Sequence, residues 1–177
     1  MVKLFKIIII LTGYLSVNHG EISAQTTIPV TAQGQVFAEV ISMYTATERA
    51  QMNFGRFSPG DQGGEIVLTP ESTVSVLGSI FIGPGSRNAA SFAVSGDVDA
   101  VFSISLPSVP VVLTHTASAR TMQVINWISN PVPGIGTGKL QNGSQMVYIG
   151  ATLKVGTVID NPVGIYSGSY SVTFDFN

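Results

Sequence analysis

The sequence lacks cysteine altogether and is poor in charge. Without cysteine, a disulfide framework and a zinc site built on thiolates are excluded, and stability has to come from burial and strand pairing. Charged residues make up 10% of the chain, against about 25% in an average soluble domain. A surface so neutral resists association poorly, which is typical of a protein that faces another subunit, a cell wall or a matrix.

Basic residues are also few, and only one long apolar run is present. Beyond residue 24 the chain holds six basic and nine acidic side chains. This balance provides no basic patch and argues against a nucleic-acid partner. No second apolar run and no apolar C-terminal tail follow the first one, so we expect no membrane span.

The N-terminus has the pattern of a secretory signal peptide. Lys3 and Lys6 precede the apolar stretch Ile7–Leu11, and small residues follow up to Ala24. The apolar stretch is far shorter than the roughly 20 residues that cross a bilayer. We therefore predict cleavage between Ala24 and Gln25, and a mature chain, residues 25–177, that is exported to the cell surface, the periplasm or the medium.

The remainder predicts an all-β fold. Short segments rich in Val, Ile, Phe, Thr and Tyr alternate with clusters of Gly, Pro, Asn and Ser, as in sandwiches and barrels. The last strand is the clearest, because period two places Tyr170, Val172, Phe174 and Phe176 on one face. About nine strands fit one two-layer antiparallel β-sandwich. The other expected strands are 35–41, 65–68, 74–82, 91–94, 101–106, 111–115, 122–128 and 145–155.

The sequence also indicates turns, and two segments allow more than one structure. Turns are expected at Ser58–Asp61 and at Asn142-Gly143, where a tight hairpin with positive φ at both residues is indicated. Thr45–Gln51 is the one candidate for a short helix. Residues 25–40 alternate loosely, and they are either the first strand of their own sandwich or an extended arm that completes a neighbouring subunit.

No constellation in the sequence favours catalysis. After removal of the leader His115 is the only histidine, and no Gly-x-Ser-x-Gly elbow accompanies it, so we interpret it as an exposed strand residue. Asp97 and Asp99 offer two carboxylates, which suit a polar turn better than a calcium site. Trp127 is either a sugar-stacking platform or a core residue, and its apolar neighbours favour the core.

The remaining motifs are also interpreted structurally. Gly134–Lys139 resembles a phosphate-binding loop, but Leu140 stands where Ser or Thr is required, so a plain loop is expected. Asn142-Gly143-Ser144 matches a glycosylation acceptor and the predicted hairpin turn, and we favour the turn. The carboxylates Glu39, Glu48, Glu65 and Glu71 show no spacing that singles out a glycosidase pair. We therefore assign no catalytic, cofactor-binding or metal-binding residue and expect no enzyme.

Several spaced pieces of the chain, between Met52 and the C-terminus, form a pattern in their order and spacing: Asn53-Phe54-Gly55, Gly63–Val67, Ala90–Gly96, Ile104–Pro107, Gly150–Gly156 and Gly164–Val172. Together these pieces resemble one bacterial exported family, the domain of unknown function 4402. This family is similar to spore-coat protein U domains and to archaic chaperone–usher pilins.

The resemblance implies an immunoglobulin-like sandwich, export and no activity. Tyr166 is a candidate corner residue whose hydroxyl bonds back to the backbone. Two hypotheses follow. The first is a structural surface protein, a fimbria-like or coat subunit that assembles with itself or related subunits by strand addition alongside Ser169–Phe176. The second is a self-contained module that binds a glycan or protein ligand, with 130–142 as its binding loop.

Overall fold

The computed structural model describes residues 29–41 and 43–176. The chain divides into two units, with the boundary between Glu39 and Val40. Residues 29–41 have exposed side chains and no regular secondary structure. The predicted leader, residues 1–24, lies outside the described residues, as do the first four residues of segment 25–40.

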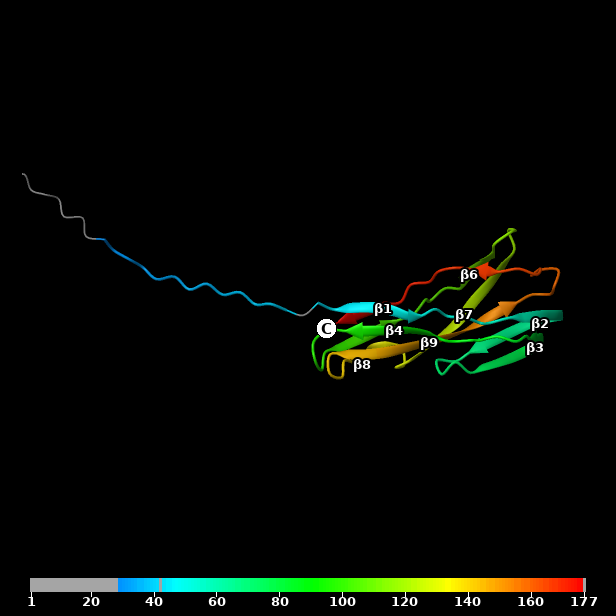
Figure 1. The fold of residues 1–177 in the computed structure, drawn as a ribbon, viewed down its shortest axis with the longest axis horizontal. Helices are drawn as coiled ribbons and strands as arrows, with labels where there is room; N and C mark the ends of the chain where they lie inside the picture. Colours follow the sequence, from blue (N-terminus) through cyan, green and yellow to red (C-terminus); the bar gives the residue numbers. More distant parts are fainter. Residues whose placement is uncertain (1–28, 42, 177) are drawn as a thin grey trace, which may run out of the picture. The chain divides into compact units, whose positions relative to one another are not determined.

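The second unit is built of eleven β-strands, shown in Figure 1. Within the described ranges no helix occurs, and accordingly none that could cross a membrane. The strands are β1 (Thr45–Ala50), β2 (Phe57–Leu68), β3 (Val74–Ile82), β4 (Ala90–Ser95), β5 (Val101–Ser105), β6 (Val111–His115), β7 (Thr121–Asn130), β8 (Gly134–Lys139), β9 (Ser144–Val155), β10 (Tyr166–Ser167) and β11 (Thr173–Phe176).

The larger sheet is organised around β9. One edge of β9 pairs with β4 along residues 144–149 and with β2 along residues 151–155, while its other edge pairs with β7. From there the sheet continues to β1 beyond β4, to β3 beyond β2, and to β6 and β10 beyond β7. All of these pairings are antiparallel, so three arms of the sheet radiate from one strand.

The smaller sheet contains β11, β5 and β8 in that order. Phe102 and Ile104 of β5 pack with Val94, Val147 and Ile149 of the larger sheet in one core cluster. A second cluster, around Ile66, Leu153 and Val124, comes from the larger sheet with Phe54. Because that sheet supplies nearly the whole cluster, it has to curl around it. The all-β sandwich expected from the sequence is confirmed.

A β-bulge in β7 reverses which side chains face the core. Met122 and Val124 are buried before the bulge, and Trp127 and Ser129 point inward after it. Pairing with β9 shifts between Ile125 and Ile128, and Asn126 has a φ of 49° there. The extra residue of a bulge shifts the inward–outward alternation of side chains by one position. Even-numbered residues therefore face the core before the bulge and odd-numbered residues after it, which explains why the sequence has apolar residues at both even and odd positions here. Trp127 consequently packs against both core clusters.

Four expectations about local structure were wrong. Thr45–Gln51 is not helical, because Thr45–Ala50 pairs edge to edge with β4. Gly134–Lys139 is not a loop but strand β8, paired with β5, where Gly138 leaves room for the Phe102 ring. Ser58–Asp61 lies inside β2, at an irregularity in its pairing between Pro59 and Gly64. Residues 35–41, which were expected to form a strand, have no regular secondary structure.

Two predicted details are confirmed. Asn142 and Gly143 have φ values of 52° and 79°, and they connect β8 to β9 as a two-residue turn. The Tyr166 hydroxyl donates to the Pro162 carbonyl oxygen at 3.0 Å, in the manner of a tyrosine corner. The hydrogen bond fixes the loop between β9 and β10 to the strand that follows it.

Replacing Tyr166 by phenylalanine should lower the free energy of unfolding by about 1 kcal/mol, because a partly buried hydrogen bond is lost and the Pro162 carbonyl is left without that donor. Urea denaturation measures the change. Tyr148→Phe is the matched control, since Tyr148 is exposed on β9. Equal stability of both variants would contradict a stabilising corner.

Candidate functional site

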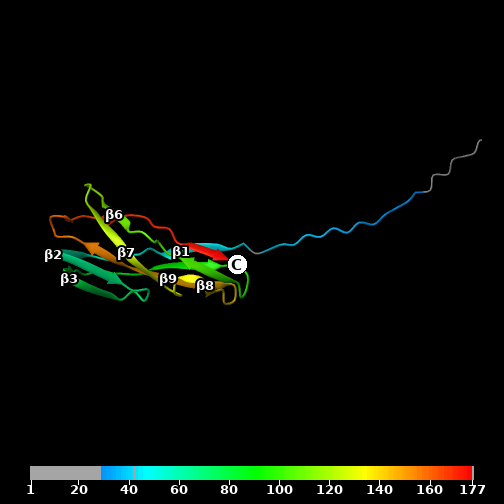
Figure 2. The same ribbon diagram turned by 180° about the vertical axis from the view of Figure 1, so that it is seen from behind.

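The sandwich has a seam where the two sheets meet without pairing. Strand β1 ends the larger sheet and β11 ends the smaller one, and both views of the ribbon place these two strands side by side (Figures 1 and 2). Among the described residues no strand lies between them. We call the facing edges, Tyr44–Ala50 and Ser169–Phe176, the seam. Each edge presents backbone N–H and C=O groups that no sheet partner uses.

The C-terminal side of the seam carries a row of apolar side chains. Tyr170, Val172, Phe174 and Phe176 all pack against the core cluster around Phe102, as the period-two pattern predicted. Phe102 contacts Phe174 and Phe176 with ring centroids 5.9 and 5.4 Å apart. None of the four is fully buried. The core cluster therefore covers one side of these four side chains, whereas the side toward the seam is only partly buried.

One end of the seam is closed by Tyr44. Its ring stacks on Phe176 with centroids 4.0 Å apart, and its hydroxyl donates to Asp97 at 2.9 Å. The hydrogen bond to Asp97 is the main reason why the pKa of Tyr44 lies above its usual value. Gly96 permits this approach, because a Cβ there would lie 2.2 Å from the Tyr44 ring. The sequence indicates a turn at Asp97 but carries no signal of its hydrogen bond with Tyr44.

The other end of the seam holds two polar atoms without partners. Trp127 and Tyr170 are in ring contact at 4.6 Å. The Trp127 Nε1 atom and the Tyr170 hydroxyl are both buried and lack a hydrogen-bond partner. Unsatisfied buried groups are uncommon in native proteins and mark places where a further partner fits. Burial, and to a lesser extent the charge of Glu48, raises the pKa of Tyr170 to about 12.

Glu48 places a carboxylate on the inner side of β1. It stands opposite Phe92, whose ring packs on the core cluster, and cross-strand neighbours share a face. The side chain is nevertheless exposed, because nothing in the described residues covers that part of the seam. A charge that points inward at a sheet edge discourages indiscriminate pairing with other strands.

His115 is not the exposed strand residue that the sequence suggested. It is buried at the end of β6. Its Nδ1 accepts from the Ala117 N–H at 3.1 Å, so the proton resides on Nε2, which donates to the Val163 carbonyl. The Ser118 hydroxyl lies 3.0 Å from the same Nδ1. Since Ala117 already uses that lone pair, the group closes a turn and is a poor base for Ser118.

The other candidate site residues, Asp97, Asp99 and Trp127, do not form a common site. Asp99 forms an ion pair with Lys139 at 2.9 Å, with both side chains exposed. Its neighbour Asp97 is directed to Tyr44. No group of three or more metal-ligating side chains occurs in the described part of the chain. Trp127 is half-buried and packs against the core, as the sequence favoured, and its ring does not form an open platform for a sugar.

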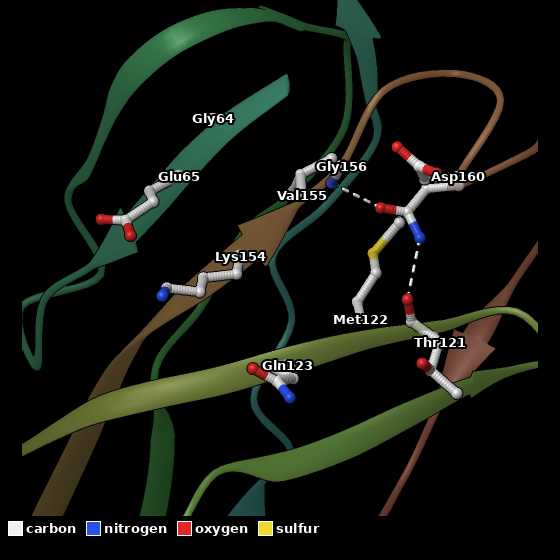
Figure 3. A pocket seen from close by; sticks show the side chains of 10 residues that line it. Gly64, Glu65, Thr121, Met122, Gln123, Lys154, Val155, Gly156 and Asp160 are labelled. Carbon is white, nitrogen blue, oxygen red and sulfur yellow. Dashed lines mark hydrogen bonds between the residues drawn. The ribbon is translucent and has the colours of Figure 1, made fainter. Parts of the chain in front are cut away.

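A shallow hollow of about 540 Å³ is lined by β2, β7, β9 and the loop that follows β9 (Figure 3). Gln123, Lys154 and Glu65 form a row across β7, β9 and β2. At its rim, Asn161 accepts from the Gly156 N–H and donates to the Thr121 carbonyl. The Thr157 hydroxyl donates to Asp160, which lowers the pKa of that carboxyl. Asn161 and Asp160 brace the loop itself, so this hollow is a weaker candidate than the seam.

Stability should fall as pH rises above 10, in part through Tyr170. A tyrosine in the unfolded chain ionises near pH 10, whereas folded Tyr170 holds its proton to about 12. Between these values the unfolded state loses the proton first, so unfolding becomes more favourable. Tyr170→Phe should remove the latest-ionising component from a near-ultraviolet absorbance titration. Persistence of that component in the variant would contradict the assignment.

Among the comparisons with known proteins, only a family model matches the chain. No curated protein and no solved structure matches the chain. Residues 44–176, which contain all eleven strands, match a family described as "Domain of unknown function (DUF4402)". The match begins at Tyr44, the residue that closes the seam, and ends at Phe176, on which Tyr44 stacks. The chain therefore belongs to the DUF4402 family.

Proposed function

We propose that this chain is an exported, non-enzymatic structural protein of the cell surface, a fimbria-like or coat subunit. Its copies assemble by strand addition, in which the segment 25–40 of one copy lies in the seam of the next. The observation that carries the proposal is the seam itself, with two unpaired strand edges over a core that is open along one side.

An inserted strand provides the seam with a backbone partner for its two free edges and a cover for its apolar side chains. Its backbone pairs with the free edges of β1 and β11, which joins the two sheets through one continuous hydrogen-bonded ladder. Its inward side chains cover the row formed by Tyr170, Val172, Phe174 and Phe176. The Trp127 Nε1 atom and the Tyr170 hydroxyl, which are buried without hydrogen-bond partners, lie beside the Tyr170 end of this row.

The segment 25–40 has the composition of such a strand. Its even positions from Ile28 to Val40 carry only apolar side chains or, at Gly34, none, while most odd positions are polar. This alternation suits a strand with one buried face. Val36 and Val40 are 95% and 97% exposed, so the apolar face of the described part is not covered. Glu39 is its only charge.

Export and surface character support the same proposal. The N-terminal pattern of Lys3, Lys6 and the apolar run predicts secretion. A chain with 10% charged residues and no disulfide benefits from assembly, because association buries neutral surface and links the stability of each subunit to its neighbours. The similarity of the DUF4402 family to coat and pilin domains is in keeping with this role.

A second candidate function is a binding module for a protein ligand. The observation that favours it is the loop 157–165, in which Asn161 is buried while Val158, Ile159, Val163 and Ile165 are exposed. The loop is held by the Asn161 amide, by Tyr166 and by His115. A rigid loop that presents apolar side chains is typical of a contact surface. This candidate predicts a stable monomer.

Deletion of residues 25–40 should leave a folded subunit that no longer assembles, because the strand that fills the neighbouring seam is gone. Light scattering after size-exclusion chromatography measures the mass, and circular dichroism confirms the β content. The intact mature chain, residues 25–177, should form multimers that resist heat. Multimers that survive the deletion would contradict the proposal.

Point substitutions test strand insertion with the whole segment still present. Val36→Asp places a charge on the apolar face, whereas Gln35→Asp places the same charge on the polar face one residue away. Only Val36→Asp should reduce multimer mass, because burying an unpaired carboxylate costs several kcal/mol. Equal behaviour of the two variants would contradict insertion with a defined face. A monomer in every case, including the intact chain, would favour the second candidate.

A further inference from the structure

Strand β3 forms a second free edge, at a different place from the seam. It pairs with β2 only, and within the described ranges no strand lies on its other side. Both views show it at the margin of the second unit (Figures 1 and 2). The nine residues Val74–Ile82 include no charged residue and no proline. Charge and proline are two of the devices that keep an exposed edge from pairing, and β3 has neither. Its ladder with β2 is irregular opposite Gly78, whose φ is 84°.

The other edges of the two sheets are protected in ways that β3 is not. Strand β1 carries Glu48 and Arg49, β11 carries Asp175, and β8 carries Lys139. Strand β10 is only two residues long. Among the strands that end the two sheets in the described chain, only β3 and the two-residue β10 carry no charged residue, although the interior strands β4, β5, β6 and β7 also lack one.

Both faces of β3 expose apolar side chains. Leu77 and Phe81 lie on the outer face and are 59% and 70% exposed. On the inner face, Ile80 reaches the core, while Val76 and Ile82 remain partly exposed at the rim. Exposed large apolar groups on a free edge mark a surface that another molecule covers.

The direction of the free backbone groups on β3 follows from its two ends. Thr69 N–H donates to the Thr73 carbonyl, and Gly83 N–H donates to the Arg56 carbonyl. In an antiparallel pair, hydrogen-bonded positions alternate. Counting inward from either end, the odd residues of β3 bond to β2 and the even residues point outward. Val76, Gly78, Ile80 and Ile82 therefore present their N–H and C=O groups to the free side.

This arrangement allows β3 to pair with itself. Two antiparallel copies related by a two-fold axis have to match even residues with even residues, so the axis passes through a residue and not between two. Centred on Ser79, the register places Leu77 opposite Phe81 on the outer face. On the inner face Val76 meets Ile82, and Gly78 meets Ile80. Apolar groups face apolar groups or glycine throughout, and no like charges meet.

Neighbouring registers fit less well. An axis through Gly78 sets Phe81 against Ser75 and leaves two glycines opposite each other. An axis through Ile80 sets Phe81 against Ser79 and brings Val76 to Pro84, which has no N–H to donate. Only the axis through Ser79 matches both large outer side chains, Leu77 and Phe81, to each other.

We propose that β3 is a homodimer interface, in which the β3 strands of two copies pair antiparallel about Ser79. The larger sheets of the two copies then form one continuous sheet. This contact is independent of the seam and of segment 25–40, because it uses another edge and gives a closed pair instead of an open chain of subunits.

Because the chain has no cysteine, single introduced thiols test the register directly. In Ser79→Cys the two thiols occupy a non-hydrogen-bonded pair, with Cα atoms about 4.5 Å apart, within the range of about 4.4–6.8 Å that a disulfide spans. Mild oxidation of the purified full chain should give a covalent dimer. Leu77→Cys and Phe81→Cys should each stay uncrosslinked, since equivalent residues lie about 13 Å apart. A mixture of these two variants should crosslink.

Non-reducing electrophoresis shows the products. A covalent dimer of Ser79→Cys, together with crosslinking of the mixture alone among the other samples, supports the interface and its register. Failure of both Ser79→Cys and the mixture to crosslink overturns the proposal, as does equal self-crosslinking by Leu77→Cys. Phe81→Lys should abolish the noncovalent dimer in light scattering, whereas Ile135→Lys, a similarly exposed control on β8, should not. These results do not depend on whether segment 25–40 assembles.

Discussion

The rest of the structure depends on the open edge of β11. A β-sandwich holds together because each sheet covers the apolar face of the other, and its edges need a partner or a protective charge. Here the core cluster around Phe102 is built from both sheets, and its last layer is the half-covered row of Tyr170, Val172, Phe174 and Phe176. The absence of cysteine means that no covalent link compensates for the missing cover. The row therefore has most to gain from an added strand.

The two free edges differ in chemistry, and this difference is the basis on which we propose different partners for them. The seam is asymmetric, with Tyr44 closing one end, Glu48 on one rim and two unsatisfied polar atoms at the other end. Such an edge suits a foreign strand of one direction. Strand β3 is uncharged and symmetric in its apolar pattern about Ser79, which suits a second copy of itself. Under the two proposals, one edge would extend an assembly and the other would join assemblies in pairs, and both contacts would bury neutral surface.

Period-two alternation predicted most of the strands and the inward row of the last one, because edge-to-core packing imposes that period directly. It missed β1, whose residues Glu48 and Arg49 look helical but are held by pairing with β4. It also missed β8, where glycines suggest a loop although Gly138 makes room for the Phe102 ring. The seam and the β3 edge were not predictable in this way. Which strand lies at an edge is decided by pairing between distant segments, and local sequence carries little of that information.

The most direct test of the central account is whether the seam accepts a strand. Trp127 is the only tryptophan in the chain and lies at one end of the seam, so its fluorescence reports on filling. A peptide with the sequence of residues 26–40, added to the subunit that lacks residues 25–40, should shift the emission to shorter wavelength and saturate. An unchanged spectrum at large peptide excess, or the same shift with a scrambled peptide, would contradict the account.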